Sequence, residues 1–378
     1  MLFEDEEEFN NWKEKHDKFM VPKLEDIRDL GDHLFLGIDS GSTTTKLVVI
    51  DENKRIIGKF YGPNNGDPIS VVTKGVSKIV DSLESLKIRP QVVCACATGY
   101  GESLIKAAFS IPLGLVETMA HFMAASYFEP DVSFILDIGG QDMKAIKIER
   151  GAIVDIQLNE ACSSGCGSFI ETFAKSLGYS AEEFAKIGLF SKAPYDLGIR
   201  CTVFMNSRVK QALKEGSSVS DISAGLAYSV IKNALYKVLK LKDISYLGER
   251  IVVQGGTFKN PLVLRALEKI IGKEVVRPDI VELMGAYGAA LFALEEYKQE
   301  PSRFSPIEMG DMTSQVEFET KEVNCKGCEN RCQVLKMKFK NNKIFYTGNR
   351  CERIFTNDAN EFGKKGKKFS KKAEGDVV

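Results

Sequence analysis

The sequence predicts an α/β protein that contains an internal repeat. A short polar turn with the pattern Asp-x-Gly-x4-Lys joins two apolar strands at residues 39–46, and the same pattern recurs between two apolar strands at 137–144. Between and after these strands, apolar residues recur at helical spacing in several segments that end at glycines. The same turn with the same flanking strands, found twice in one chain, indicates a duplicated unit.

Length and composition limit the class of protein. A chain of 378 residues is expected to form two or three domains, and 44% hydrophobic with 27% charged residues is ordinary for a globular protein. A net charge of −1 argues against a nucleic-acid partner. No run of 18 apolar residues predicts a membrane span, and the acidic N-terminus is the opposite of a signal peptide. We therefore expect a cytoplasmic protein, in which nine cysteines are more typical of metal ligands than of disulfides.

Residues 1–32 form an extension ahead of the first repeat. The segment is rich in Glu, Lys and Asp, with Phe9, Trp12, Phe19 and Met20 dispersed along it. A solvated helix without a chemical role is the favoured interpretation, and an amphipathic helix that packs on the body of the protein or on a partner is the alternative.

The two repeated turns have the residue types of a phosphate site. Backbone amides and Ser/Thr hydroxyls in such a turn can hold phosphate oxygens, and aspartates suit Mg²⁺ through its water ligands. Lys46 suits the outer phosphates, and Gln141 or Asp142 suits the orientation of an attacking water. The P-loop and Rossmann patterns are absent. The candidate nucleotide-binding residues are Asp39, Gly41, Ser42, Thr43, Lys46, Gly139 and Gly140, and the candidate catalytic residues are Asp137, Gln141 and Asp142.

Two further glycine-rich segments are candidates for the nucleoside. The strand at 250–253 runs into Gly255-Gly256, and Gly288 lies in a small-residue helix start at 285–290. Glycine lets the backbone approach an adenine or a ribose closely, although plain packing explains each glycine equally well. A strand at 94–98 carries two cysteines that we expect in the core. Glu117 and His121, four residues apart, are expected on a helix surface or at an interface.

Two cysteines each stand ahead of a helical pattern, Cys162 before 169–177 and Cys201 before 203–213. A helix start offers unpaired N–H groups and partial positive charge, which suit an anionic iron–sulfur cluster. A [4Fe–4S] cluster needs four thiolates, so a twofold dimer would complete a site for which each chain supplies two. Buried, inert cysteines are the competing interpretation.

The last segment carries a second cysteine pattern. Cys325, Cys328, Cys332 and Cys351 form Cys-x2-Cys-x3-Cys-x18-Cys, and the strands predicted at 333–340 and 343–347 would return the last cysteine to the first three. Four thiolates suit zinc or a second iron–sulfur cluster, and the absence of any metal is the third alternative. The basic stretch 364–372 predicts disorder.

Taken together, the motifs resemble one known family. The segments are Gly37-Ile-Asp-Ser-Gly-Ser-Thr43, Ala97-Thr-Gly-Tyr-Gly101, Asp137-Ile-Gly-Gly-Gln-Asp142, Cys162-Ser-Ser-Gly, Cys201-Thr-Val-Phe, Gly255-Gly and Gly285-Ala-Tyr-Gly-Ala-Ala290. In this order, over residues 33–297, they resemble the activator ATPases of 2-hydroxyacyl-CoA dehydratases and the ATPase subunits of benzoyl-CoA reductases. The chain departs from the shorter activators at Cys166, where they often carry Thr, and in its cysteine-rich extension.

The resemblance implies a duplicated actin/sugar-kinase/Hsp70-like ATPase fold and a homodimer. It implies that Cys162 and Cys201 of both chains hold one shared [4Fe–4S] cluster. ATP with Mg²⁺ would then drive low-potential electron transfer, with hydrolysis to ADP, to a dehydratase, reductase or double-cubane partner. Ferredoxin or flavodoxin is the expected donor. A small-molecule kinase and an ATP-switched scaffold are the competing functions. The expected domains are 1–32, 33–132 with 285–298, 133–284 and the extension 299–378.

Overall fold

The computed structural model describes residues 1–159, 165–314 and 316–357. The predictions made for Cys162 and for the basic stretch 364–372 therefore lie outside the described residues. Contacts group the chain into two units, one of residues 1–23 with 118–284 and one of residues 24–117 with 285–378. In the described parts of the chain, no helix is long and apolar enough to cross a membrane.

The unit of residues 24–117 and 285–378 is built on a five-stranded sheet of order β3-β2-β1-β5-β6. β1, β2 and β3 pair antiparallel in sequence, whereas β5 and β6 run parallel to β1. The strands are β1 (Leu34–Ser40), β2 (Thr44–Asp51), β3 (Ile56–Pro63), β5 (Cys94–Thr98) and β6 (Leu113–Gly114), and a separate pair joins β4 (Gln91–Val92) to β11 (Ile307–Glu308).

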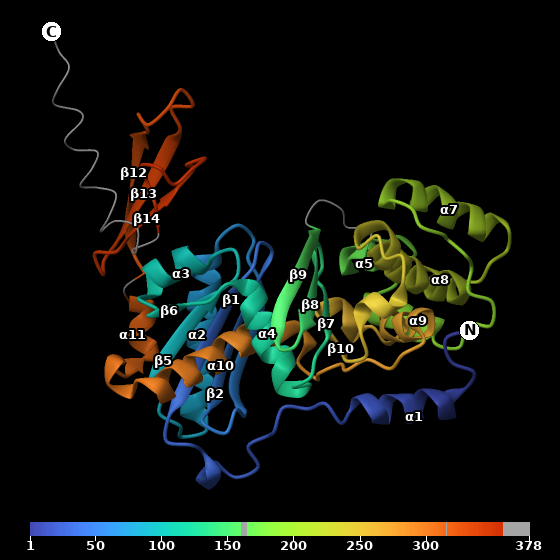
Figure 1. Ribbon diagram of the computed structural model, residues 1–378, viewed down its shortest axis with the longest axis horizontal. Helices are drawn as coiled ribbons and strands as arrows, with labels where there is room; N and C mark the ends of the chain where they lie inside the picture. Colours follow the sequence, from blue (N-terminus) through green and yellow to red (C-terminus); the bar gives the residue numbers. More distant parts are fainter. Residues whose placement is uncertain (160–164, 315, 358–378) are drawn as a thin grey trace. The chain divides into compact units, whose positions relative to one another are not determined.

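Helices cover both faces of this sheet (Figure 1). One face packs Leu36, Ile38 and Leu47 against α2 and α3, and a buried aliphatic side chain of this kind contributes about 1.5–3 kcal/mol. On the other face, a Cβ on Gly37 would lie 1.9 Å from the Ala286 carbonyl oxygen of α10, so only glycine permits this approach. The helices are α2 (Pro68–Ser85), α3 (Glu102–Phe109), α10 (Met284–Gln299) and α11 (Met309–Ser314).

The unit of residues 1–23 and 118–284 repeats the plan with a four-stranded sheet of order β10-β7-β8-β9. β7, β8 and β9 are antiparallel neighbours, and β10 runs parallel to β7. The strands are β7 (Phe134–Ile138), β8 (Met143–Glu149), β9 (Ala152–Asn159) and β10 (Ile251–Gln254). Both predicted hairpins are therefore confirmed, and each has a parallel strand beside its first strand.

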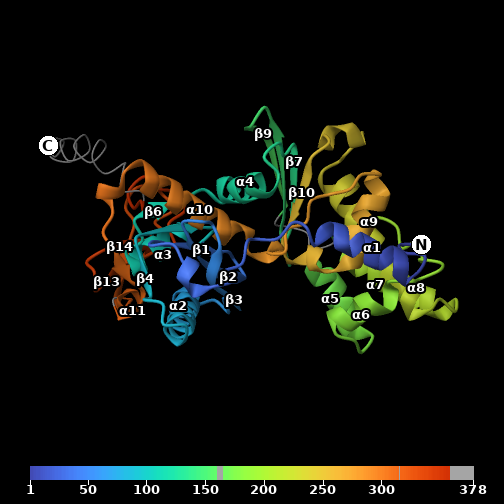
Figure 2. The ribbon, with the colours of Figure 1, turned by 90° about the horizontal axis from the view of Figure 1, so that it is seen from below.

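Alternate residues of β7 face two different helical layers. Ile135 packs with Ala125 of α4, whereas Leu136 and Ile138 face the core formed with the other helices. Figure 2 shows α5, α8 and α9 on one side of this sheet and α4 on the other. The helices are α4 (Glu117–Phe128), α5 (Gly167–Ser176), α6 (Ala181–Gly188), α7 (Thr202–Lys214), α8 (Val219–Lys232) and α9 (Pro261–Ile271).

α8 begins at Val219, where Ser218 caps it by accepting a hydrogen bond from the Asp221 amide. The helix continues as a π-helical segment, Asn233–Val238. Short 3₁₀ turns lie at Ile27–Asp29, Ile244–Leu247, Gly256–Lys259, Val281–Leu283 and Pro301–Arg303.

The N-terminal extension forms α1 (Glu6–His16), which packs on its own unit. Trp12 Nε1 donates to Glu268 Oε2 of α9 over 2.5 Å, and His16 Nε2 lies 3.1 Å from Glu268 Oε1. Leu2 and Phe3 are fully buried in the same core. The helix therefore packs on the body of the protein, as in the amphipathic alternative, and the favoured interpretation of a solvated helix is wrong.

The C-terminal extension is a three-stranded antiparallel sheet of β12 (Phe318–Asn324), β13 (Gln333–Phe339) and β14 (Ile344–Thr347). The predicted hairpin about Asn341 is confirmed, and β12 is an additional strand. Asn341 Nδ2 donates to the Ala107 carbonyl of α3 over 2.8 Å, and Phe339 joins the core beside α3. This end of the extension is thereby fixed to its unit.

Candidate functional site

The first hairpin brings its predicted residues together at one turn. Asp39 of β1 and Lys46 of β2 are directly opposite in the strand register, and Lys46 Nζ lies 3.0 Å from Asp39 Oδ2. The Gly41 amide donates to the Thr44 carbonyl over 2.9 Å and closes the turn, whose tip residues Ser42 and Thr43 are exposed. The turn thus presents hydroxyl groups and a lysine around one carboxylate.

Asp39 has an uncompensated oxygen. The residue is 1% exposed, and its Oδ1 atom has no hydrogen-bond partner in the structure. A buried carboxylate oxygen without a donor is costly, so its retention indicates a ligand that supplies one. The water shell of Mg²⁺ is such a donor, and the residues present therefore fit the metal that the resemblance implies.

The second hairpin repeats the first in detail. Asp137 and Lys144 are again opposite in register, and the Gly139 amide again donates to the carbonyl three residues later, that of Asp142, over 2.9 Å. Lys144 Nζ lies 2.6 Å from Asp142 Oδ2 and 3.8 Å from Asp137 Oδ2. Gln141 is exposed at the tip of the turn. The second turn therefore carries two carboxylates on one lysine, where the first carries one.

A glycine that follows the parallel strand is repeated as well. Gly99 after β5 has φ +86°, and a Cβ there would lie 2.7 Å from Asp39 Oδ1. Gly255 after β10 has φ +88°, and a Cβ there would lie 2.5 Å from Asp137 Oδ1. Each aspartate thus has a backbone glycine against its carboxylate, at a position where any larger residue would clash with the carboxylate oxygen. The sequence indicated Gly255 as a candidate for nucleoside binding, whereas Gly99 stood only within the motif Ala97–Gly101.

His121 was assigned wrongly by the sequence reasoning. The side chain is 6% exposed on α4, so it is neither on the surface nor at an exposed interface. Gln254 Nε2 donates to the His121 carbonyl over 2.9 Å, which turns Gln254 Oε1 toward His121 Nδ1. His121 Nε2 lies 3.6 Å from Asp137 Oδ2. His121 and Gln254 therefore brace the carboxylate of Asp137, a role that the linear spacing with Glu117 did not reveal.

The turn of the second hairpin is hydrogen-bonded to the start of α5. The Gly139 carbonyl accepts from the Gly167 amide over 3.0 Å and from Thr257 Oγ1 over 2.9 Å, and the Gly140 carbonyl accepts from the Ser168 amide over 2.9 Å. A Cβ on Gly167 would lie 2.5 Å from Thr257 Oγ1, so the contact requires glycine. Any displacement of the turn is thereby transmitted to the first residues of α5.

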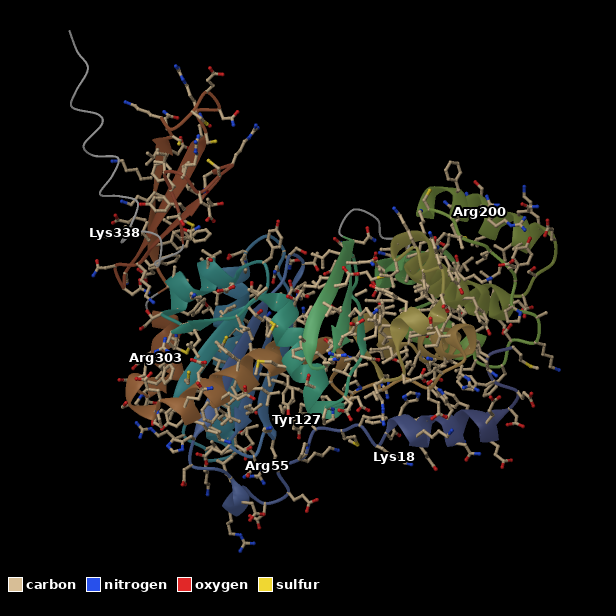
Figure 3. All side chains as sticks on the ribbon, in the orientation of Figure 1. Lys18, Arg55, Tyr127, Arg200, Arg303 and Lys338 are labelled. Atoms are coloured by element: carbon tan, nitrogen blue, oxygen red, sulfur yellow. The ribbon has the colours of Figure 1, made fainter. Side chains whose placement is uncertain are left out.

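The cysteine region partly differs from the prediction. The residue that caps α5 is Cys166, which is fully buried, whereas Cys162 lies outside the described residues. Cys201 caps α7 as predicted, is half-buried, and makes no capping hydrogen bond with its side chain. Arg200, labelled in Figure 3, immediately precedes it and is exposed. Cys201 is thus placed at the N-terminus of a helix.

Apolar side chains are exposed in α7 after Cys201 and on β9. Phe204 is 66% exposed, one turn after Cys201. Val154, Ile156 and Leu158 of β9, an edge strand that leads toward residue 162, are 52%, 41% and 54% exposed. Such exposure on an edge strand is a liability unless another surface covers it.

The remaining predicted residues divide between core and extension. Cys94 and Cys96 are buried in β5 as expected, and burial raises the pKa of Cys94 to about 12, which makes it a poor ligand. Gly288 is buried in α10, and Gly256 begins a 3₁₀ turn. The four extension cysteines line one pocket. Among the residues that the structure describes, no three His, Cys, Asp or Glu side chains are already gathered as a metal shell.

The fold and the paired Asp hairpins define an ATPase of the actin and sugar-kinase architecture, as the sequence predicted. Residues 36–293 match the model of the BadF/BadG/BcrA/BcrD ATPase family, and the chain belongs to that family. It is 31% identical over 264 residues to the (R)-2-hydroxyglutaryl-CoA dehydratase activating ATPase of Acidaminococcus fermentans, covering 69% of this chain and 97% of that protein.

Two solved structures show the same fold. The component A structure of (R)-2-hydroxyglutaryl-CoA dehydratase from A. fermentans aligns with a TM-score of 0.62 at 30% identity, over 71% of this chain and all of that one. The activator of 2-hydroxyisocaproyl-CoA dehydratase from Clostridium difficile, with bound ADPNP, aligns at 0.61 and 27% identity, over 72% and 99%. These alignments cover 69%, 71% and 72% of this chain, so roughly three tenths of it has no counterpart in them.

Proposed function

We propose that this protein is an ATP-dependent activator that delivers a low-potential electron to a partner iron–sulfur protein. The family relationship supports the class, because relatives named above are activators of 2-hydroxyacyl-CoA dehydratases. The observation that carries the proposal is the pair of hydrogen bonds that the first amides of α5 donate to the Gly139 and Gly140 carbonyls. These bonds connect the turn at residues 139–140, a candidate phosphate site, to α5, the helix that follows Cys162 in the sequence.

In the proposed function, each unit contributes its own hairpin to the binding of ATP with Mg²⁺. Asp39 in one unit and Asp137 in the other are each a residue that would hold the metal, and the burial of each carboxylate beside a glycine, Gly99 or Gly255, supports this role. Gln141 or Asp142 orients the water that attacks the terminal phosphate. The remaining residues assigned to the nucleotide are Gly41, Ser42, Thr43, Lys46, Gly139, Gly140, Gly255, Gly256 and Gly288.

The proposed electron carrier is one [4Fe–4S] cluster held by Cys162 and Cys201 of two identical chains, which supplies one electron at low potential. The capping position of Cys201 supports its part in this set, because a helix N-terminus stabilises an anionic ligand. The exposed apolar side chains of β9 and Phe204 support the second copy, whose surface would cover them. Cys166, buried at the α5 cap, is a neighbour of this set in the chain.

The free energy that ATP binding can supply matches the free energy needed to make the electron more reducing. For a one-electron couple, about 59 mV corresponds to about 1.4 kcal/mol, so an electron roughly 200 mV more reducing needs about 5 kcal/mol. A nucleotide that switches a two-state protein almost completely supplies about 5.5 kcal/mol through its differential affinity. Displacement of the 139–140 turn on ATP binding would move the start of α5 through the hydrogen bonds described. ATP hydrolysis then returns the protein to its starting state and makes electron transfer irreversible.

The partner is an iron–sulfur dehydratase or reductase component, including the double-cubane type, and the donor is a ferredoxin or flavodoxin. The proposal is tested with anaerobic protein, dithionite as the electron source and a dehydratase component as acceptor. Wild-type protein is expected to reduce the acceptor only with ATP, and Cys201→Ala is expected to bind ATP but transfer no electron. Transfer by Cys201→Ala at the wild-type rate would contradict the assignment, and phosphorylation of a sugar or acid would favour the kinase alternative.

A further inference from the structure

We infer that the C-terminal extension binds one structural zinc ion through Cys325, Cys328, Cys332 and Cys351. This site is separate from the proposed nucleotide and cluster residues, and the inference does not rest on the proposed function. The relatives described above cover at most 72% of the chain, and the family match ends at residue 293, so nothing about the family assigns these cysteines a role.

The strand topology brings the four cysteines to one end of the extension. β12 ends at Asn324 and β13 begins at Gln333, so Cys325, Cys328 and Cys332 lie in the loop that joins them. β14 ends at Thr347 at the same end of the sheet, because it pairs antiparallel with β13, and Cys351 follows four residues later. The opposite end is the Asn341 turn that contacts α3.

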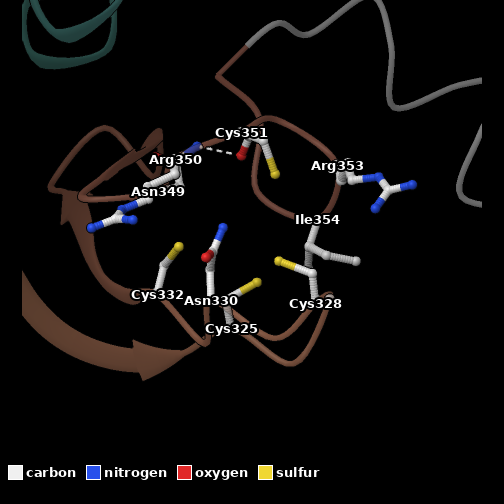
Figure 4. Close-up of a pocket in the computed structure, with 10 residues that line it drawn as sticks. Cys325, Cys328, Asn330, Cys332, Asn349, Arg350, Cys351, Arg353 and Ile354 are labelled. Carbon is white, nitrogen blue, oxygen red and sulfur yellow. Dashed lines mark hydrogen bonds between the residues drawn. The ribbon is translucent and has the colours of Figure 1, made fainter.

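The two cysteine loops form a common pocket. All four cysteines line it, together with Asn330 and Arg350, and Figure 4 shows their sulfur atoms directed toward the space between the loops. A Cβ on Gly327 would lie 2.6 Å from Ile354 Cγ1 of the second loop and 3.5 Å from Cys325 Sγ. The loops are therefore packed on each other where glycine allows it.

Hydrogen bonds define the backbone of both loops. The Cys325 amide donates to the Cys332 carbonyl over 2.8 Å, which closes the first loop at its base. Asn349 Nδ2 donates to the Cys351 and Phe355 carbonyls, each over 3.0 Å, and curls the second loop around the pocket. Two pre-shaped loops that each present cysteines are the usual construction of a structural Cys₄ zinc site.

The local charge suits four thiolates on a divalent ion, a group with a net charge of −2. The loops 325–332 and 348–354 carry the basic residues Lys326, Arg331, Arg350 and Arg353 and the acidic residues Glu329 and Glu352. The resulting excess of two positive charges offsets the charge of such a site. The protons of the four thiols pass to solvent when the metal binds.

Zinc needs less space between the loops than a cluster would. The cavity that the four cysteines line is about 50 Å³. A [4Fe–4S] cluster would place eight heavy atoms in this space. Zinc places one atom and draws the four sulfurs to about 2.3 Å from it.

The extension also needs a stabilising element at this end. Val323 of β12 is partly buried, and the other residues of that strand are exposed. Met337 and Phe339 of β13 pack toward α3, at the other end of the sheet. Val334, at the start of β13 and near the cysteines, has a fully buried side chain. A small sheet with so little core of its own is typically held by a metal or by disulfides, and these four cysteines are not disulfide-bonded.

Zinc binding requires the four sulfur atoms to move closer together, because in the described structure they are not yet grouped as metal ligands. Cys328 and Cys351 are exposed and Cys332 is half-buried, so side-chain rotation and a small loop adjustment can bring them to the buried Cys325. Zinc is therefore expected to order both loops, which gives the site a readout independent of ATP hydrolysis.

The test uses the full chain, purified anaerobically from cells grown with zinc and iron. Wild-type protein is expected to hold about one zinc per chain. Cys328→Ser and Cys351→Ser, at exposed positions that should not disturb the core, are expected to lose most of it. Cys94→Ala is the matched control and keeps the zinc. Cobalt added to the metal-free chain should give thiolate-to-cobalt charge-transfer bands and protect residues 325–354 from protease.

Cys201→Ala separates this inference from the proposed function, since it is expected to lose iron but keep zinc. Wild-type protein without zinc after zinc-replete growth would overturn the inference. So would iron bound by the extension cysteines, or zinc retained in full by both Cys328→Ser and Cys351→Ser. If a serine variant does not fold, titration of metal-free wild-type protein with zinc and with cobalt gives the same decision.

Discussion

At the scale of single residues, each of the two aspartates lies beside a lysine of the same hairpin. Asp39 is paired with Lys46, whereas Asp137 has Lys144 at 3.8 Å and His121 at 3.6 Å. The two turns share one backbone geometry but differ in the groups around the carboxylate. This difference suggests that Asp137, with the additional Asp142, serves the hydrolytic step.

The first prediction concerns Asp137 and the histidine that braces it. Asp137→Asn is expected to slow ATP hydrolysis at least about 100-fold, the lower range for a group that acts on the reacting water or its metal. His121→Ala is expected to slow it roughly 10- to 100-fold, because partners of a metal-binding carboxylate act by orientation. Steady-state hydrolysis with separate kcat and KM values measures both effects.

The matched control is His33→Ala. His33 pairs with Glu52 at the start of β1 and contacts neither turn. It is expected to leave kcat within about twofold of wild type, as surface changes usually do. Unchanged kcat in Asp137→Asn would remove Asp137 from the active site, and equal losses in both histidine variants would show that His121 acts only through stability.

At the scale of elements, the connection between the 139–140 turn and α5 yields a second prediction. Gly167→Ala places a methyl group 2.5 Å from Thr257 Oγ1 and forces the turn and the helix apart. We expect ATP binding to change little, while ATP-dependent electron transfer falls at least about 10-fold, equivalent to about 1.4 kcal/mol of coupling. Nucleotide titration and acceptor reduction measure the two separately.

Gly310→Ala is the control for this variant. Gly310 lies in α11, and a Cβ there would meet nothing within 4 Å. It should leave both binding and transfer unchanged. Gly167→Ala protein that transfers electrons at the wild-type rate would show that these hydrogen bonds do not carry the coupling.

The N-terminal helix yields a third prediction, on pH. Burial raises the pKa of Glu268, but the hydrogen bonds from His16 and Trp12 outweigh it, and the net pKa lies below the ordinary 4.5. A carboxylate whose pKa is lowered on folding stabilises the protein above pH 4.5, and this stabilisation is lost as pH falls through the folded value. The packing of α1 is thus expected to weaken below about pH 4.5.

Trp12 is the one tryptophan in the sequence, so its fluorescence reports on this helix. Wild-type emission should shift to the red on acidification below pH 4.5. Glu268→Gln should weaken the packing by about 1–3 kcal/mol at neutral pH and reduce the acid-dependent step. Glu274→Gln, which removes an exposed pair with Lys15, should behave as wild type. An identical acid transition in Glu268→Gln would refute the role of this carboxylate.

Local pattern predicted much of the fold at this scale. Both hairpins, the helix ends near Gly178 and Gly216, and the Asn341 hairpin follow from strand alternation and glycine positions. The sequence could not reveal contacts between distant segments, such as His121 with Gln254 or Gly139 with Gly167. It also missed β12, whose residues are nearly all exposed and so lack an apolar pattern. The capping position of Cys166 was missed because the helix begins two residues before its first apolar residue.

At the scale of the whole molecule, the chain combines a duplicated ATPase fold with two additions. The duplication gives each unit one Asp hairpin, one parallel strand and one glycine against the carboxylate. The N-terminal helix adds a buried ionic contact to one unit, and the cysteine-rich sheet adds a candidate metal site to the other. The central claim is that the ATPase fold exists to control a cluster shared between two copies.

The most direct test of this claim is the iron and sulfide content per chain, measured together with the mass of the native assembly, after anaerobic reconstitution. The account predicts a dimer with one [4Fe–4S] cluster, about two iron atoms per chain, and loss of the cluster from both Cys162→Ala and Cys201→Ala while each variant still binds ATP. A monomer that holds a complete cluster, or either variant with full iron content, would contradict it.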